Sequence, residues 1–128
     1  MRIHPGINEV KSYVIKYVRE NGPNRIETRL DDVNAYYTQS KQNKHWLLEF
    51  NFDDMRLIYD MEDKMLVSPV RDDFYMESFS INKSAHRRFE FTGTFRLTNE
   101  LGETIKEYAF FGENDCWLPE GVAYLPKQ

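Results

Sequence analysis

The apolar residues change their period once along the chain, at residues 21–24 (Asn-Gly-Pro-Asn). After this stretch, apolar and polar residues alternate, as they do in strands with one buried face. Before it, apolar residues recur at the spacing of an amphipathic helix, and Gly22 and Pro23 supply a typical helix stop. The sequence therefore predicts one helix over residues 7–20, with an apolar stripe made of Ile7, Val10, Val14, Tyr17 and Val18.

The clearest alternating run covers residues 89–97 (Phe-Glu-Phe-Thr-Gly-Thr-Phe-Arg-Leu). Residues 99–102 (Asn-Glu-Leu-Gly) follow as a hairpin turn, in which Gly102 can adopt a positive φ. Residues 112–128 are less regular, although 122–125 could add a short edge strand. Turn residues divide the rest of the chain into strands predicted at 25–30, 33–39, 45–52, 55–60, 65–70, 74–81, 88–98 and 103–111.

This order of elements predicts an α+β fold: an N-terminal helix packed on a strongly bent antiparallel meander of seven or eight strands, in a single domain over residues 1–128. Consecutive strands joined by short turns usually pair with each other, and a sheet of this size curls. A small closed β-barrel with an N-terminal helix is the alternative. The difference matters because only the open sheet leaves one face uncovered.

Composition narrows the class of protein. Aromatic residues make up 15% of the 128 residues, so a core of few, large side chains is expected. The single cysteine, Cys116, excludes an internal disulfide and favours a reducing compartment. Residues 1–5 lack the apolar stretch of a signal peptide, and no run of apolar residues reaches membrane-spanning length. We therefore expect a cytoplasmic protein.

Charge is unevenly distributed. Residues 1–29 contain six Lys or Arg and three Glu, whereas residues 31–63 contain three basic and eight acidic residues. The net charge of −4 argues against bulk nucleic-acid binding, which uses a positive surface. The asymmetry suits a protein partner of complementary charge.

Motifs for catalysis or metal binding are weak. The carboxylates of segment 53–63 lack the spacing and the glycine of a calcium loop. Residues 62–64 (Glu-Asp-Lys) match half of a metal-dependent nuclease motif, but they fall on a predicted turn and not on a strand. His4, His45, His86 and Cys116 include no closely spaced ligand pair. The sequence therefore predicts no catalytic residue, metal site or cofactor, and it leaves open whether segment 53–63 binds a metal.

Aromatic residues offer a candidate binding surface. Tyr36-Tyr37 and Phe110-Phe111 place neighbouring rings on opposite faces of a strand. If a helix covers one face only, we expect Tyr108 and Phe110 to lie on the outward face. Exposed rings within a polar rim are typical of protein interfaces, although a closed barrel would cover them. The aromatic residues predicted to contact a partner are Tyr36, Tyr37, Tyr108, Phe110 and, in the C-terminal segment, Trp117.

Lys83, Arg87 and Arg88, together with His86, form a local basic cluster. It could extend the partner-binding surface, or it could hold the phosphates of a single-stranded nucleic acid. A solvated loop is the structural alternative.

These features favour a non-enzymatic protein-binding accessory factor, inhibitor or regulator that uses an aromatic sheet face and charged edges to bind a larger protein. The alternative is a small-molecule binding protein or small enzyme with a pocket between helix and sheet, lined in part by His45 or Glu49. Single-stranded nucleic-acid binding is the third hypothesis. The partner and the oligomeric state are not specified by the sequence.

Overall fold

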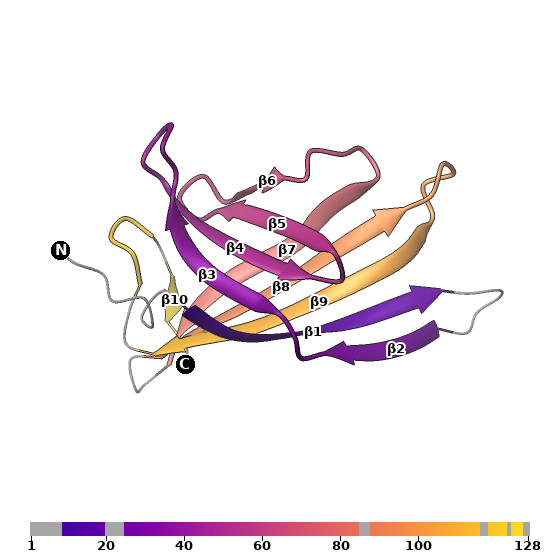
Figure 1. The fold of residues 1–128 in the computed structure, drawn as a ribbon, viewed down its shortest axis with the longest axis horizontal. Helices are drawn as coiled ribbons and strands as arrows, with labels where there is room; N and C mark the ends of the chain where they lie inside the picture. Colours follow the sequence, from indigo (N-terminus) through magenta and orange to yellow (C-terminus); the bar gives the residue numbers. More distant parts are fainter. Residues whose placement is uncertain (1–8, 20–24, 85–87, 116–117, 123, 127–128) are drawn as a thin grey trace.

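The computed structural model describes residues 9–19, 25–84, 88–115, 118–122 and 124–126 (Figure 1). Within these ranges the chain is all-β, with ten strands and no helix. It follows that no described segment is a helix of the length and apolarity needed to cross a bilayer. The strands are β1 (Glu9–Arg19), β2 (Arg25–Leu30), β3 (Asn34–Gln39), β4 (Trp46–Phe52), β5 (Met55–Asp60), β6 (Met65–Ser68), β7 (Phe74–Lys83), β8 (Arg88–Thr98), β9 (Thr104–Asp115) and β10 (Leu125–Pro126).

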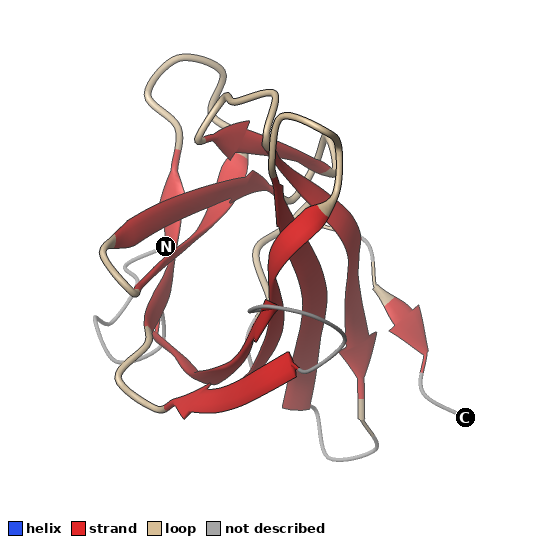
Figure 2. Cartoon of the chain, turned by 90° about the vertical axis from the view of Figure 1, so that its right-hand side faces the viewer, coloured by secondary structure: helices blue, strands red, loops and turns tan. Residues whose placement is uncertain are grey.

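Eight of the strands form a nearly closed antiparallel barrel in the order β7-β8-β9-β1-β3-β4-β5-β6 (Figure 2). β6 and β7 lie next to each other at the seam, with no continuous ladder between them in the described part of the chain. The two remaining strands are additions to this wall. β2 pairs with the second half of β1, and β10 pairs in parallel with β7.

The predicted N-terminal helix is wrong, because residues 9–19 form strand β1. Val10 and Val14 are both buried, as the helix would require, but a spacing of four residues also returns to the same face of a strand. Half of the β1 sequence is β-branched or aromatic, and such residues favour strands. β1 pairs with β9 over Lys11–Val18, so its backbone hydrogen bonds go to the sheet and not along a helix.

The fold is therefore all-β and not α+β, and the barrel alternative fits once its helix is removed. β1 brings about the closure, because it is the strand that joins the two ends of the meander. Its first residues pair with β3 (Val10 with Ala35), while its other edge follows β9. Register shifts within β5–β6 and β7–β8 add curvature.

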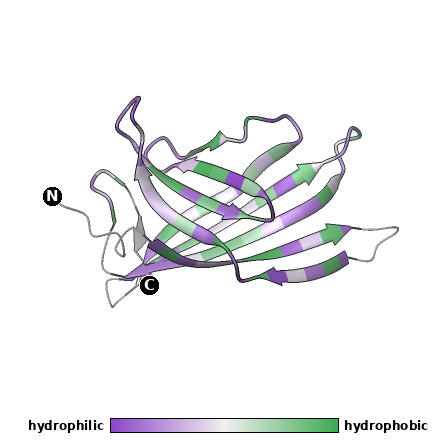
Figure 3. Ribbon diagram, viewed as in Figure 1, coloured by the Kyte–Doolittle hydropathy of each residue, from purple (hydrophilic) through white to green (hydrophobic). Residues whose placement is uncertain are grey.

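Aromatic side chains fill the barrel interior. Phe50 stacks on Phe110 with ring centroids 4.4 Å apart, and Tyr59 meets Phe79 at 4.1 Å across the seam. Figure 3 shows the alternation of hydrophobic and hydrophilic positions along the strands that produces this inward face. The largest fully buried side chains are those of Tyr37, Tyr108, Phe50, Phe91, Phe95, Phe110, Leu48, Leu57, Met61 and Val14.

A polar contact closes one end of the barrel. Asp53 and Asp54 both have positive φ, as the two central residues of a tight hairpin between β4 and β5 require. The carboxylate of Asp53 accepts a hydrogen bond from Lys16 Nζ on β1 at 2.6 Å and one from Tyr108 Oη on β9 at 3.2 Å. The turn between β4 and β5 is thereby linked to β1 and β9, which pair with each other across the barrel from it.

Most of the predicted strands are confirmed, including 25–30, 55–60 and 88–98. The strand predicted at 45–52 agrees with β4 to within one residue. The hairpin turn at residues 99–102 is also confirmed: Gly102 has φ 79°, and its N–H donates to the carbonyl oxygen of Asn99. The irregular segment was expected to begin at residue 112, whereas β9 continues to Asp115 because it pairs there with β8. The short edge strand is at Leu125–Pro126.

Candidate functional site

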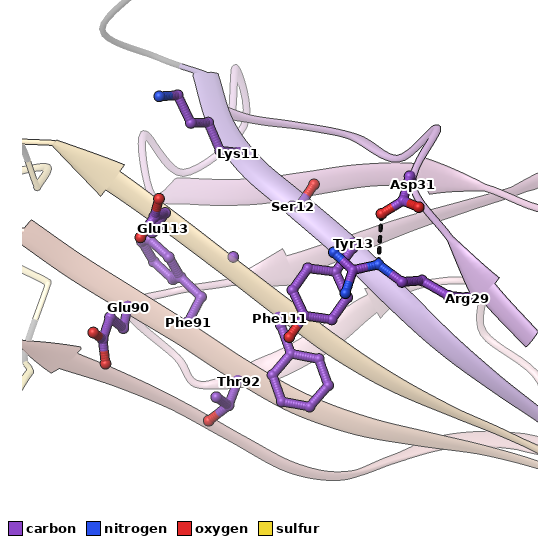
Figure 4. A pocket seen from close by; sticks show the side chains of 11 residues that line it. Lys11, Ser12, Tyr13, Arg29, Asp31, Glu90, Phe91, Thr92, Phe111 and Glu113 are labelled. Atoms are coloured by element: carbon purple, nitrogen blue, oxygen red, sulfur yellow. Dashed lines mark hydrogen bonds and ion pairs between the residues drawn. The ribbon is translucent and has the colours of Figure 1, made fainter.

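A trough of about 430 Å³ lies on the outer face of β1, β8 and β9 (Figure 4). Its side chains come from two neighbouring rows that run across the strands. Thr92, Phe111 and Tyr13 are register partners in one row, and Glu90, Glu113 and Lys11 are partners in the next. All six point outward, because the residues between them on each strand face the barrel interior.

The trough lies where β1 changes its partner. β1 pairs with β3 only at Glu9 and Val10, and with β2 only from Val14 onward, so residues 11–13 have no ladder on that edge. The connection between β2 and β3 crosses this gap, where Ser12 Oγ donates a hydrogen bond to the Val33 carbonyl oxygen at 3.3 Å. A second hollow of about 400 Å³ adjoins the trough here and shares Lys11, Ser12 and Asp31 with it.

The aromatic wall of the trough is a stack of three groups. The rings of Tyr13 and Phe111 are 5.0 Å apart and nearly parallel, and the Arg29 guanidinium lies 3.8 Å from the centroid of the Tyr13 ring. Arg29 Nε also donates to Asp31 at 2.7 Å, and this hydrogen bond raises the pKa of the guanidinium. The wall thus combines flat apolar surface with a fixed positive charge.

The second row of the trough, formed by Glu90, Glu113 and Lys11, is charged. Glu113 is joined to Arg88 at 3.3 Å, and the same guanidinium reaches Asp115 at 3.0 Å. Lys11, in contrast, is exposed and has no ion pair with another described residue. An ammonium group at the rim of a trough with an aromatic wall can receive the anionic group of a planar ligand.

Three of the aromatic residues predicted to contact a partner lie inside the barrel. They are Tyr37, Tyr108 and Phe110, each at most 1% exposed, so the expectation that Tyr108 and Phe110 point outward is wrong. Tyr36 is half-buried on the outer face of β3, beside Glu49. Burial and the hydrogen bond with Glu49 raise the pKa of Tyr36. The face of β9 that was predicted to point outward is the inner face of the closed barrel. Because no helix covers the sheet in the described residues, the aromatic rings of this face pack against each other in the interior.

The basic cluster is described only in part. Lys83 ends β7 with its Nζ 5.5 Å from the Tyr124 ring centroid, and Arg88 begins β8 with its two carboxylate partners. Arg87 and Trp117, which were also predicted to contact a partner, lie outside the described residues. Because Arg88 is already paired with Glu113 and Asp115, it offers less charge to a phosphate than the sequence indicated.

The pocket predicted between helix and sheet has no counterpart, because residues 9–19 are a strand. Glu49 instead lies on the outer face of β4, buried beneath its ion pair with Arg56. His45 precedes β4, and its Nδ1 lies 3.0 Å from Asp60 and 3.5 Å from Asp63. Neither His45 nor Glu49 lines the trough.

His45, Asp60 and Asp63 could hold a metal ion, since their ligand atoms lie within 4.8 Å of one another. Their own contacts account for the arrangement, however. Asp60 Oδ1 accepts hydrogen bonds from the backbone N–H groups of Glu62 and Asp63, which define the turn after β5. Burial acts to raise the pKa of Asp60, but these hydrogen bonds and the one with His45 outweigh it and lower that pKa.

The residues of the trough were missed by the sequence analysis. Phe111 was assigned to the inward face and Phe110 to the outward face, which is the reverse of the structure. Lys11 and Tyr13 were placed on a helix. Phe111 shares one face of β9 with the charged residues Glu107 and Glu113. These two charges are the signal that could have identified this face as the outer one.

Comparison of the chain with protein-family profiles, with curated proteins and with solved structures finds no match, so the fold and the geometry of the trough are the basis for a function.

Proposed function

We propose that this protein is a small-molecule-binding β-barrel whose ligand occupies the trough on the outer face of β1, β8 and β9. The observation that carries the proposal is the trough itself: about 430 Å³, within the range of ligand sites, with a stacked aromatic pair on one side and charged groups on the other. The filled interior supports an outer site, since aromatic side chains occupy the space in which many barrels hold a ligand.

The ligand class follows from the charges. Asp31 is paired with Arg29 and Glu113 with Arg88, and the third carboxylate of the trough, Glu90, also has an interaction partner. Lys11 is the positive group at the rim that has no ion pair among the described residues. Phe111 and Tyr13 offer apolar surface to a flat ring. We therefore infer a small planar organic anion, with its ring against Phe111 and its charged group near Lys11.

The test uses two probes with the same ring and opposite charge, 2-naphthoate and 2-naphthylmethylammonium. Binding is measured by isothermal titration calorimetry and mapped by amide chemical-shift changes. We expect saturable binding of the naphthoate, several-fold tighter than that of the ammonium, with the largest shifts on β1, β8 and β9. Lys11→Gln should remove the charge preference, and Phe111→Leu should weaken both probes.

Tyr75→Ala, at an exposed position on β7 outside the trough, is the matched control and should bind like the wild type. Equal binding of the two probes by the wild type, or shifts confined to residues outside the trough, would contradict the proposal. Protein binding through the predicted aromatic residues, and binding of single-stranded nucleic acid, stay predictions. Protein binding is no longer supported by outward-facing Tyr108 and Phe110 rings, because both are buried.

A further inference from the structure

Strand β2 is an uncovered edge of the sheet. In the described part of the chain it is hydrogen-bonded to β1 alone, and five of its six residues are exposed. Figure 1 shows it running along the outside of β1, away from the barrel wall. The other edge of β2 therefore presents backbone N–H and C=O groups that pair with no described strand, and such groups are a template for another strand.

The side chains of β2 alternate in character. Arg25, Glu27 and Arg29 share the outer face of the sheet with Tyr17 and Tyr13, whereas Ile26, Thr28 and Leu30 lie on the other face. Ile26 is 48% exposed, so its side chain is available to a partner strand. Glu27 has no ion pair with another described residue.

We propose that β2 pairs antiparallel with β2 of a second copy of this chain, about a twofold axis at Thr28, so that the two sheets become continuous. In this register Glu27 lies opposite Arg29 of the second copy, and Ile26 lies opposite Leu30 of the second copy. Arg25 likewise lies opposite Asp31 of the second copy. Each of these pairs occurs twice because the interface is symmetric.

Among registers with the axis at residues 26–29, charge and the length of the overlap together favour the one at Thr28. Two residues that lie directly opposite in an antiparallel pair must both direct their backbone N–H and C=O groups toward the other strand, or both direct them away. Two copies of one strand meet this condition only when the twofold axis passes at a residue and not between two residues. An axis at Glu27 would place Glu27 opposite itself and Arg25 opposite Arg29. An axis at Arg29 would place Arg29 opposite itself and Glu27 opposite Asp31. Both are repulsive.

An axis at Ile26 pairs Arg25 with Glu27 without repulsion, but it overlaps fewer residues of the strand and leaves Arg29 and Asp31 outside the contact. The axis at Thr28 spans residues 25–31 of both copies and uses every charge of that segment. It also covers the exposed Ile26 side chain with Leu30. The inference does not depend on the proposed ligand, since the strand pairing uses the outer edge of β2. Arg29 and Asp31 belong both to this contact and to the trough.

Sedimentation equilibrium of the full chain over a wide concentration range tests the dimer. We expect a reversible monomer–dimer equilibrium that is lost in Thr28→Lys, because a charge at the axis meets its own copy. Thr28→Val is the matched control and should still dimerise. Circular dichroism and urea unfolding check that Thr28→Lys is folded. We expect it to fold, because Thr28 is exposed. A wild type that is monomeric throughout, or a dimer insensitive to Thr28→Lys, overturns the proposal.

Two further variants test the register. Glu27→Arg should weaken dimerisation about tenfold, since two attractive pairs become repulsive, and adding Arg29→Glu should restore it. In a Cys116→Ser background, Thr28→Cys should form an intermolecular disulfide on mild oxidation, because directly opposite residues have the required Cα separation. Leu101→Cys, in an exposed turn, is the control and should not. Cross-linking through Ile26→Cys but not Thr28→Cys overturns the register.

Discussion

Phe110 and Phe111 are neighbours in sequence and lie on opposite faces of one strand. Phe110 is fully buried and packs on Phe50, whereas Phe111 is half-buried, stacks on Tyr13 and lines the trough. The inner ring belongs to a dense cluster in which many contacts are lost together. The outer ring has one aromatic neighbour and one open side. The aromatic residues of this chain therefore have two roles: they stabilise the interior of the barrel, and they form a candidate binding surface on its outer face.

The strongest test of this difference is truncation of each ring. Phe110→Ala should lower the free energy of unfolding by about 3–5 kcal/mol, because it leaves a cavity in a close-packed interior. Phe111→Ala should lower it by about 1 kcal/mol, since mainly one stacking contact is lost. Urea unfolding followed by circular dichroism measures both. Similar losses for the two variants would mean that the trough side of the wall is also part of the core.

A smaller effect is expected where an inner residue carries a polar group. Burial and the carboxylate of Asp53 raise the pKa of Tyr108 to about 12, so its neutral hydroxyl donates to that carboxylate. Tyr108→Phe keeps the ring and removes the hydrogen bond, and should cost about 1–2 kcal/mol of stability. Tyr75→Phe, at an exposed position, should cost much less. Equal losses in the two variants would show that the contact with Asp53 contributes nothing.

The same contact predicts an acid dependence. Hydrogen bonds from Lys16 and Tyr108 hold the pKa of Asp53 below its ordinary value of 3.8, although burial acts in the opposite direction. Since the folded state has the lower pKa, the stabilisation is present above about pH 3.8 and is lost as the pH falls through the folded pKa. The stability difference between wild type and Asp53→Asn should therefore shrink below pH 3.8. A difference that is constant with pH would contradict this assignment.

The smallest effect concerns a solvated contact on the outer side. The hydrogen bond with Asp60 raises the pKa of His45 above its ordinary value of 6.5, and burial only partly opposes it. The stabilisation from charged His45 is complete below pH 6.5 and is lost as the pH rises through the folded pKa. NMR titration of the His45 ring should give a pKa above 6.5 in the wild type and a lower value in Asp60→Asn. A wild-type pKa at or below 6.5 would show that the contact is not formed in solution.

The sequence predicted the elements best where local chemistry decides them. The hairpin at residues 99–102 needed only Gly102 and the alternation on both sides of it. The strand predicted at 45–52 agrees with β4 to within one residue, because Leu48, Phe50 and Phe52 alternate with more polar residues and are all buried. In these segments the side-chain period fits one secondary structure only.

Residues 9–19 were predicted wrongly because their period fits two structures. Val10, Val14 and Val18 repeat every four residues, a spacing shared by one face of a helix and one face of a strand. The choice was made by β9, which offers β1 eight consecutive register partners. Backbone pairing between residues about a hundred positions apart in the chain is a tertiary property, and no local pattern contains it.

Side-chain period and the conformational freedom of a few residues are enough to specify the alternating strands, their turns and an aromatic-rich core. Which face of each strand is inside depends on tertiary pairing. Closing the barrel turned Tyr108 and Phe110 inward, placed Tyr13, Phe111 and Lys11 around one trough, and left one edge of β2 without a described partner strand. A strand alternates between two faces, and the strands that pair across the whole sheet set which of these faces becomes the interior.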